Sequence, residues 1–216
     1  SLGVAEAYKR GFWEADDLVN VFRIFVRRRG QESLQEEIVA RLATIPALLL
    51  HRLRDNGRKN SRENIQAHYD LGNEFFALWL DPTMTYSCGI FESPCSTLQE
   101  ASEAKLRRLC LKLNLCNGLS VAEIGSGWGS FAIMAARDFG CKVTSVTLSK
   151  EQQREANRRI QSAGLGHLAD VKILDYRDLK GQYDRLVSIE MVEAIGHSRL
   201  KEFFANKSET CDAESC

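Results

Sequence analysis

The chain has 216 residues, and its 29 basic side chains are balanced by 29 acidic ones. A nucleic-acid-binding protein normally shows a basic excess, so this balance argues against that class. Hydrophobic residues make up 44% of the chain, which suits one globular domain with an appendage, and no apolar run approaches the roughly 20 residues that span a bilayer. The seven cysteines form no Cys-x-x-Cys pair, so we expect no metal site and interpret them as reduced thiols of a cytoplasmic protein.

The first 60 residues predict a helical appendage. Residues 2–29 are amphipathic, with Asp16 or Asp17 as a helix cap, and a further helix is expected over 33–53 with a kink at Pro46. The polar stretch at 52–62 contains the Asn56-Gly57 turn and marks a boundary. Basic side chains of this segment suit either the headgroups of anionic lipids or a solvated face.

The second part of the chain alternates strands and helices. After helical regions near 75–80 and 97–115, strands are expected at residues 119–124, 141–148, 171–174 and 183–189, with helices at 130–139 and 150–163. This alternation predicts an α/β fold with a parallel sheet and crossover helices. We therefore expect domains over residues 1–60 and 61–206.

Residues 123–129 form a glycine loop between the first expected strand and its helix. Gly125, Gly127 and Gly129 let the backbone turn sharply and approach a ligand, which the following helix N-terminus can contact. The spacing fits neither a dinucleotide fingerprint nor a phosphate-binding P-loop. Glu123, just before the loop, suits the positively charged amino or sulfonium group of S-adenosylmethionine (SAM).

The ends of the next two strands offer further ligand positions. Ser149 predicts a helix cap, with Gln152 as the second member of a capping box, and Thr147 and Gln152 are candidates for the ribose. Tyr176 and Arg177 would enclose an adenine ring, although a solvated loop explains the same residues.

Several blocks in order carry a family resemblance. They are Ala67-His68-Tyr69-Asp70-Leu71-Gly72-Asn73, Trp79-Leu80-Asp81, Met84-Thr85-Tyr86-Ser87-Cys88, the glycine loop with Trp128, and residues 147–152, 175–178 and 187–193. With these blocks, residues 2–204 resemble the cyclopropane fatty acid synthase family, which includes the mycolic acid methyltransferases. The resemblance implies a Rossmann-like methyltransferase fold.

The resemblance also implies a reaction. Family members transfer the SAM methyl group to the cis double bond of a membrane phospholipid acyl chain, and a bound bicarbonate removes a proton so that a cyclopropane ring closes. It assigns contacts with the bicarbonate to Cys88 and Ile189 through the main chain and to Glu193 through its side chain. A covalent role for Cys88 is the weaker hypothesis. The positions that match SAM-binding residues are Tyr86, Ser87, Val121, Ala122, Glu123, Ile124, Gly125, Ser126, Gly127, Trp128, Gly129, Thr147, Leu148, Ser149, Lys150, Glu151, Gln152, Tyr176 and Arg177.

The chain departs from the family pattern in two places. It reads Val192-Glu193-Ala194 where the family has Phe-Glu-His, and residues 207–216 match nothing in the family. We expect a C-terminally truncated, peripheral membrane enzyme with a possible homodimer. Two alternatives stay open: a catalytically incomplete SAM-binding or regulatory module, and a fatty acid methyltransferase that adds a methyl branch.

Overall fold

The computed structural model describes residues 2–28, 72–195 and 199–208. The chain divides into two compact units, Ser1–Asp55 and Asn56–Cys216, and each is described by itself. The expected helix over 33–53, the turn at residues 56–57, the 67–71 part of the first family block and residues 209–216 of the tail lie outside the described residues.

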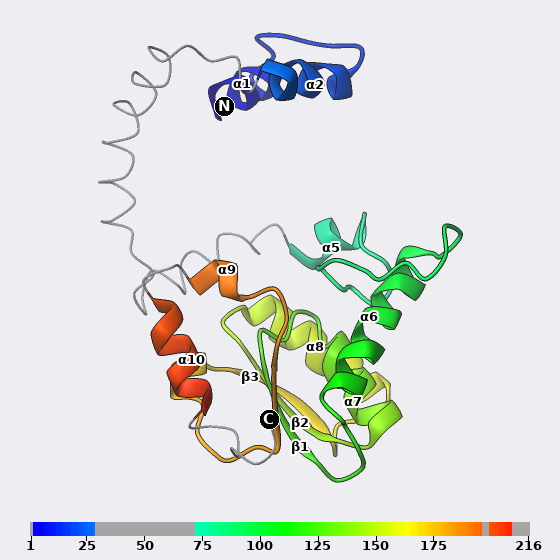
Figure 1. Cartoon of the computed structure of the whole chain (residues 1–216), viewed down its shortest axis with the longest axis vertical. Coiled ribbons are helices and arrows are strands. Elements are labelled where there is room, and N and C mark those ends of the chain that lie inside the picture. Colours follow the sequence, from blue (N-terminus) through cyan, green and yellow to red (C-terminus); the bar gives the residue numbers. More distant parts are fainter. Residues whose placement is uncertain (1, 29–71, 196–198, 209–216) are drawn as a thin grey trace. The chain divides into compact units, whose positions relative to one another are not determined.

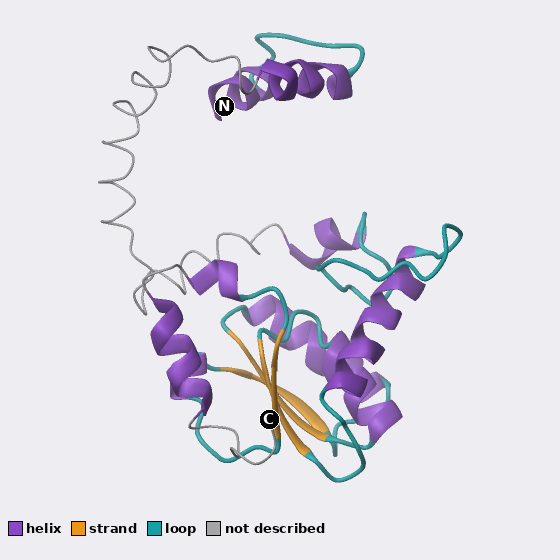
Figure 2. Ribbon diagram, viewed as in Figure 1, coloured by secondary structure: helices purple, strands orange, loops and turns teal. Residues whose placement is uncertain are grey.

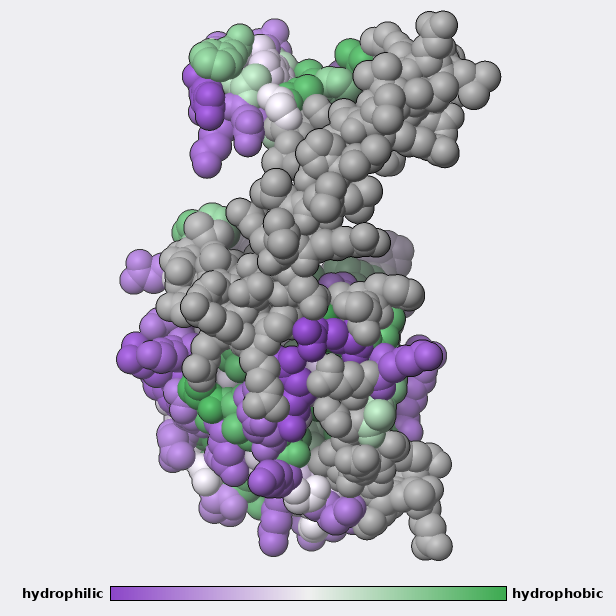
Figure 3. Space-filling view, turned by 90° about the vertical axis from the view of Figure 1, so that its left-hand side faces the viewer, coloured by the Kyte–Doolittle hydropathy of each residue, from purple (hydrophilic) through white to green (hydrophobic). Residues whose placement is uncertain are grey.

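The N-terminal unit contains α1 (Leu2–Lys9) and α2 (Leu18–Arg28). Asp17 is the cap of α2, because its Oδ1 accepts the Asn20 N–H at 3.1 Å. The apolar side chains of α2 are largely exposed, Phe22 and Val26 among them. Hydrophobic and hydrophilic surface therefore lie side by side on this unit (Figure 3). Within the described residues, no helix is long and apolar enough to cross a membrane.

In the described part of the second unit, two helices precede the sheet. The short α5 (Gly72–Ala77) is followed by a loop and then by α6 (Leu98–Lys112). Thr97 caps α6 in a complete capping box, since its hydroxyl accepts the Glu100 N–H and the Glu100 carboxylate accepts the Thr97 N–H. The loop between these helices carries residues 84–88 of the family resemblance.

Four parallel strands form the sheet, in the order β3-β2-β1-β4. They are β1 (Ser120–Ile124), β2 (Lys142–Thr147), β3 (Ala169–Ile173) and β4 (Arg185–Ser188). The helical elements between and after them are α7 (Ser130–Phe139), α8 (Lys150–Ser162), the 3-10 turn η1 (Tyr176–Asp178), α9 (Val192–Ile195) and α10 (Leu200–Ser208). This arrangement, seen in Figures 1 and 2, confirms the expected α/β fold.

The strand ends differ from the expectation by up to two residues. β3 begins at Ala169 instead of Val171, because its buried residues alternate with the more exposed Asp170 and Lys172. An edge strand of this kind pairs on one side only within the described sheet, and its apolar run is shorter than its hydrogen-bonded length.

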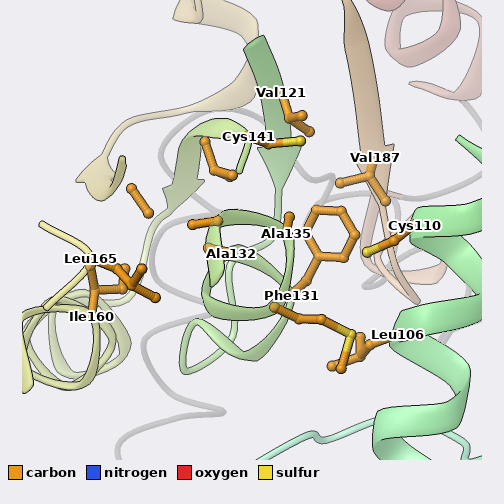
Figure 4. Packing of buried hydrophobic residues seen from close by; sticks show 14 of the residues in the cluster. Leu106, Cys110, Val121, Phe131, Ala132, Ala135, Cys141, Ile160, Leu165 and Val187 are labelled. Atoms are coloured by element: carbon orange, nitrogen blue, oxygen red, sulfur yellow. The ribbon is translucent and has the colours of Figure 1, made fainter. Parts of the chain in front are cut away.

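Helices cover both faces of the sheet, and each face has its own core (Figure 2). On the face of α6, α7 and α8, the Phe131 ring lies among Leu106, Cys110 and Val187 (Figure 4). On the face of α10, Phe203 packs with residues of β1 and β2. Burial on both faces fixes the register of the central strands, and with it the position of the loops at their carboxyl ends.

Candidate active site

The glycine loop lies at the carboxyl edge of the sheet, between β1 and α7. All three glycines have positive φ, with values of 89° at Gly125, 50° at Gly127 and 86° at Gly129. An added Cβ at Gly125 would lie 3.1 Å from the Met191 Sδ, and one at Gly129 would lie 3.1 Å from the Ala156 Cβ. A Cβ at Gly127 would meet nothing within 4 Å. Two glycines therefore permit close packing, and Gly127 leaves open space that a ligand can occupy.

Glu123 is a buried carboxyl directly beneath this loop. It is paired in register with Ser145 of β2, whose hydroxyl donates to the Glu123 carboxylate. Burial raises the pKa of Glu123 to about 8, and the hydrogen bond from Ser145 offsets only part of this effect. A cation above the loop would favour the ionised form, as the amino group of SAM requires.

The end of β2 is held by a buried hydrogen-bond chain. Ser149 is the cap of α8, because its hydroxyl accepts the Gln152 N–H at 3.2 Å. The expected capping box is only half right, because the Ser149 N–H donates to Thr147 Oγ1 instead of to Gln152. The Thr147 hydroxyl in turn donates to Gln152 Oε1 at 3.0 Å. Lys150 and Glu151, also expected to contact the cofactor, are exposed in the first turn of α8, and Leu148 is half-buried.

The residues expected at the adenine are packed against other parts of the chain. The Arg177 guanidinium forms a buried two-point ion pair with Asp175, with N–O distances of 2.8 and 2.6 Å. The Tyr176 ring meets Phe203 edge-on, with 5.1 Å between ring centroids. A cofactor ring at this position would therefore contact side chains that are already packed against the protein. The charge of Arg177 is neutralised by Asp175.

An aromatic cluster connects α5 with the glycine loop. The buried Phe76 ring lies 5.0 Å from Trp128 and 5.5 Å from Tyr86, and Trp79 meets Tyr86 edge-on at 5.1 Å. The Trp128 indole N–H donates to Asn73 Oδ1 at 2.7 Å. The half-exposed Tyr86 thus joins the aromatic cluster that contacts the glycine loop through Trp128.

Arg159 of α8 fixes the backbone that leads to Tyr86. Its guanidinium donates to the carbonyl of Thr83 at 2.6 Å, to that of Pro82 at 2.8 Å and to that of Trp128 at 3.2 Å. The Ser130 hydroxyl also donates to the Thr83 carbonyl. No local sequence pattern marks Arg159, since all three acceptors lie at least 31 residues away along the chain.

Ser87 and Cys88 meet two charged residues that were not expected at the site. The Cys88 N–H donates to Glu190 Oε1 at 2.9 Å, and the buried Lys105 ammonium donates to the Ser87 hydroxyl. Burial lowers the pKa of Lys105, and nearby Glu190 opposes that shift. Hydrogen bonding to Glu190 and its negative charge raise the pKa of the Cys88 thiol, which disfavours the nucleophilic thiolate.

The contacts of the described residues do not join the three expected catalytic positions. Ile189 is half-buried and packs against the larger core, and Glu193 is exposed on α9. The Cys88 amide, assigned by the resemblance to bicarbonate, is bonded to Glu190. A bicarbonate bound to the Cys88 N–H would have to displace the Glu190 carboxylate and would then lie close to its negative charge. The described residues therefore do not fit a bicarbonate at this position. Nor do the described residues include a group of three His, Cys, Asp or Glu side chains placed to hold a metal ion.

Solved structures define the class of protein. Mycolic acid cyclopropane synthase CmaA1, complexed with SAH and CTAB, is 36% identical, with a TM-score of 0.68 over 70% of this chain and 53% of that chain. Coclaurine N-methyltransferase, at 24% identity and a TM-score of 0.61, shares the fold. The fold is that of the SAM-dependent methyltransferases.

The family follows from the sequence comparisons. Residues 56–215 match the model of the mycolic acid cyclopropane synthetase family, and the chain belongs to that family. It is 39% identical to the tuberculostearic acid methyltransferase UfaA1 of Mycobacterium tuberculosis, over 94% of this chain and 49% of the relative. It is also 39% identical to the cyclopropane-fatty-acyl-phospholipid synthase of Escherichia coli K12, over 95% of this chain and 52% of the relative. The chain thus spans about half the length of these relatives.

Proposed function

We propose that this chain carries the SAM-binding half of an enzyme that methylates the cis double bond of unsaturated phospholipid acyl chains and closes a cyclopropane ring. The observation that carries the proposal is the open space at Gly127. The next residue, Trp128, contacts the Phe76 ring, which also contacts Tyr86 in the segment, residues 84–88, found in the cyclopropane synthase resemblance. The family membership and the synthase from E. coli support it.

The described residues fit SAM. The open space at Gly127, close to the N-terminus of α7, suits a cofactor, and the Glu123 carboxyl suits its ammonium group. The half-exposed Tyr86 lies in the aromatic cluster that contacts the loop. Bound SAM would supply an electrophilic methyl group. The chain's own residues would orient it and keep water away from the acceptor carbon.

Apolar surface near Tyr86 suits an acyl chain. Trp79 lies against Tyr86, and the side chains of Phe75, Leu78 and Phe91 are exposed in the same segment of α5 and the following loop. A flexible hydrocarbon gains free energy from such surface by leaving water, without needing a specific hydrogen bond. This surface therefore supports a lipid substrate over a small polar one.

The test is methyl transfer from SAM carrying a labelled methyl group to vesicles of dioleoyl phosphatidylglycerol. The expected product is an acyl chain one CH2 unit heavier with its double bond lost, identified by mass spectrometry. At the same low SAM concentration, the Gly127→Ala variant should give much less product. If calorimetry shows that the chain binds SAM while no lipid is labelled, the alternative of a SAM-binding module is correct.

Two relatives favour a second candidate, a fatty acid methyltransferase that makes a methyl or methylene branch. One is UfaA1, and the other is a probable fatty acid methyltransferase of Pseudomonas putida, 43% identical over 68% of this chain and 38% of the relative. A product that is one CH2 unit heavier but keeps a double bond would identify a methylene branch. A product without a double bond that is heavier by one CH2 unit and two further hydrogens, supplied by a reductant in the assay, would identify a methyl branch.

We further propose that α2 contacts the surface of an anionic membrane. Phe22, Phe25 and Val26 are exposed on the same helix as Arg23 and Arg27, so apolar and basic side chains face solvent together. A helix at a membrane interface places its apolar side chains among the acyl chains and its basic side chains at the headgroups.

Vesicle cosedimentation tests this contact. Phe22→Asp should reduce binding to phosphatidylglycerol vesicles severalfold, whereas Phe204→Asp, a similarly exposed phenylalanine on α10, should leave it unchanged. Equal binding of both variants and the unaltered chain would contradict the proposal.

A further inference from the structure

Glu190 is an unexpected residue at the site, and its backbone is constrained. Its φ is 47°, in the left-handed region that a residue with a Cβ occupies only under strain. The conformation turns the chain as it leaves β4, and the carboxylate reaches the Cys88 N–H at 2.9 Å. A strained residue with a defined long-range contact at a sheet edge is typical of a functional position.

The neighbours of Glu190 place it beside the cofactor loop. Ser188 of β4 is paired in register with Ile124, the last residue before Gly125. Met191, directly after Glu190, packs against Gly125. Glu190 is thus bracketed by two residues that touch the start of the glycine loop, while its side chain bonds to the segment that carries Tyr86 and Ser87.

The charges around Glu190 distinguish it from the other nearby carboxylate. Asp81 is buried and accepts from the Thr83 N–H and from the Ser102 hydroxyl, so its oxygens are occupied. The Glu190 residue is exposed, and buried Lys105 supplies a positive charge nearby. Of Asp81 and Glu190, two carboxylates that contact the loop between α5 and α6, Glu190 is therefore the one that a substrate can reach.

We propose that Glu190 is the proton acceptor of the ring-closing step, in place of a dissolved anion; this rests on the proposed function. After the acyl chain has gained a methyl group, a Glu190 oxygen takes a proton from that methyl carbon. The electron pair of the broken C–H bond forms the second ring C–C bond and neutralises the acyl cation. Glu190 leaves the step as a neutral carboxylic acid and returns its proton to water.

Two variants separate this role from a structural one. Glu190→Gln keeps an oxygen for the Cys88 N–H but cannot accept the proton, so the chain should unfold at the same temperature and lose about 100-fold or more of its cyclopropane formation. Glu190→Ala should lose the same activity but open the anion position, so added bicarbonate should restore part of it. Bicarbonate should not restore Glu190→Gln. Glu92→Ala, an exposed loop glutamate, is the matched control.

A binding measurement decides the assignment independently of turnover. Carbon-13 NMR of labelled bicarbonate, added with SAH, should show binding to Glu190→Ala and none to the unaltered chain or to Glu190→Gln. Equal responses of the three proteins, whether binding or none, would overturn the proposal. So would activity of the unaltered chain that disappears in carbonate-free buffer. Absence of labelled lipid from every protein would count against the proposed function alone, because the NMR result stands without it.

Discussion

The two sides of the site are built in different ways. On the glycine-loop side, Ser149, Gln152 and Thr147 bond to one another within a few residues of sequence. On the opposite side, Cys88 bonds to Glu190 and Arg159 bonds to Thr83, across long stretches of chain. The first side depends on local geometry, and the second exists only once the sheet has brought distant segments together. Substitutions on the two sides should therefore fail in different ways.

The largest expected effect is a loss of stability on the side of the site that is held by contacts between distant segments. Arg159→Gln removes charged donors from three backbone carbonyls, two of them in the loop before Tyr86. It should lower the free energy of unfolding by about 3 kcal/mol, measured by urea denaturation. The neighbouring Arg158→Gln breaks only an exposed ion pair with Glu155 and should leave the free energy of unfolding nearly unchanged. Similar losses for the two variants would mean that Arg159 does not hold the loop.

The next largest effect is expected on the glycine-loop side of the site. Gly127→Ala places a methyl group in open space, so it should weaken SAM binding about 30-fold, or about 2 kcal/mol by calorimetry, with a smaller loss of stability. Gly129→Ala would press a Cβ against Ala156 and should mainly lower stability. SAM binding that is unaffected by Gly127→Ala would show that the open space is not the cofactor site.

The smallest effect concerns the protonation of Glu123. Its folded-state pKa, about 8, lies above the ordinary value of 4.5, so between these pH values the folded chain holds a proton that the unfolded chain releases. Stability should therefore fall as pH rises through this window, by about 1 kcal/mol from pH 6 to pH 7. Denaturation of Glu123→Gln should lack this decline. Parallel pH profiles of the two proteins would contradict the buried neutral carboxyl.

SAM binding offers a second measurement of the same group. A cation beside Glu123 favours its ionised form, so binding should release a proton and strengthen as pH rises from 6 to 8. Glu123→Gln should show a flatter pH dependence of the dissociation constant. An unchanged slope in the variant would place the positive group of the cofactor elsewhere.

The same contrast explains what the sequence could predict. The caps at Asp17 and Ser149, the α7 boundaries and the glycine loop follow from residues that are close in sequence. The exchange of partners at Thr147 was missed because two nearby acceptors compete for the Ser149 N–H. Local pattern cannot decide between them without the positions of the side chains.

The unexpected site residues share a different cause. Lys105 is one of many charged residues on α6, and nothing in its spacing distinguishes the one lysine that is buried beside Ser87. Glu190 was not expected at the site because the resemblance assigned the catalytic side-chain contact to nearby Glu193. Its role depends on a left-handed backbone turn and on a partner in a distant loop. Only the assembled sheet provides both.

The order of the strands also has a consequence for folding kinetics. Ala122 of β1 pairs with Thr144 of the next strand on one side and with Leu186 of β4 on the other. Closing the second pairing costs more chain entropy, so β4 should join late, after the β1–β2 pair has formed. Amide hydrogens of β4 should consequently exchange with deuterium earlier than those of β2. The strand that precedes Glu190 would then open before β2.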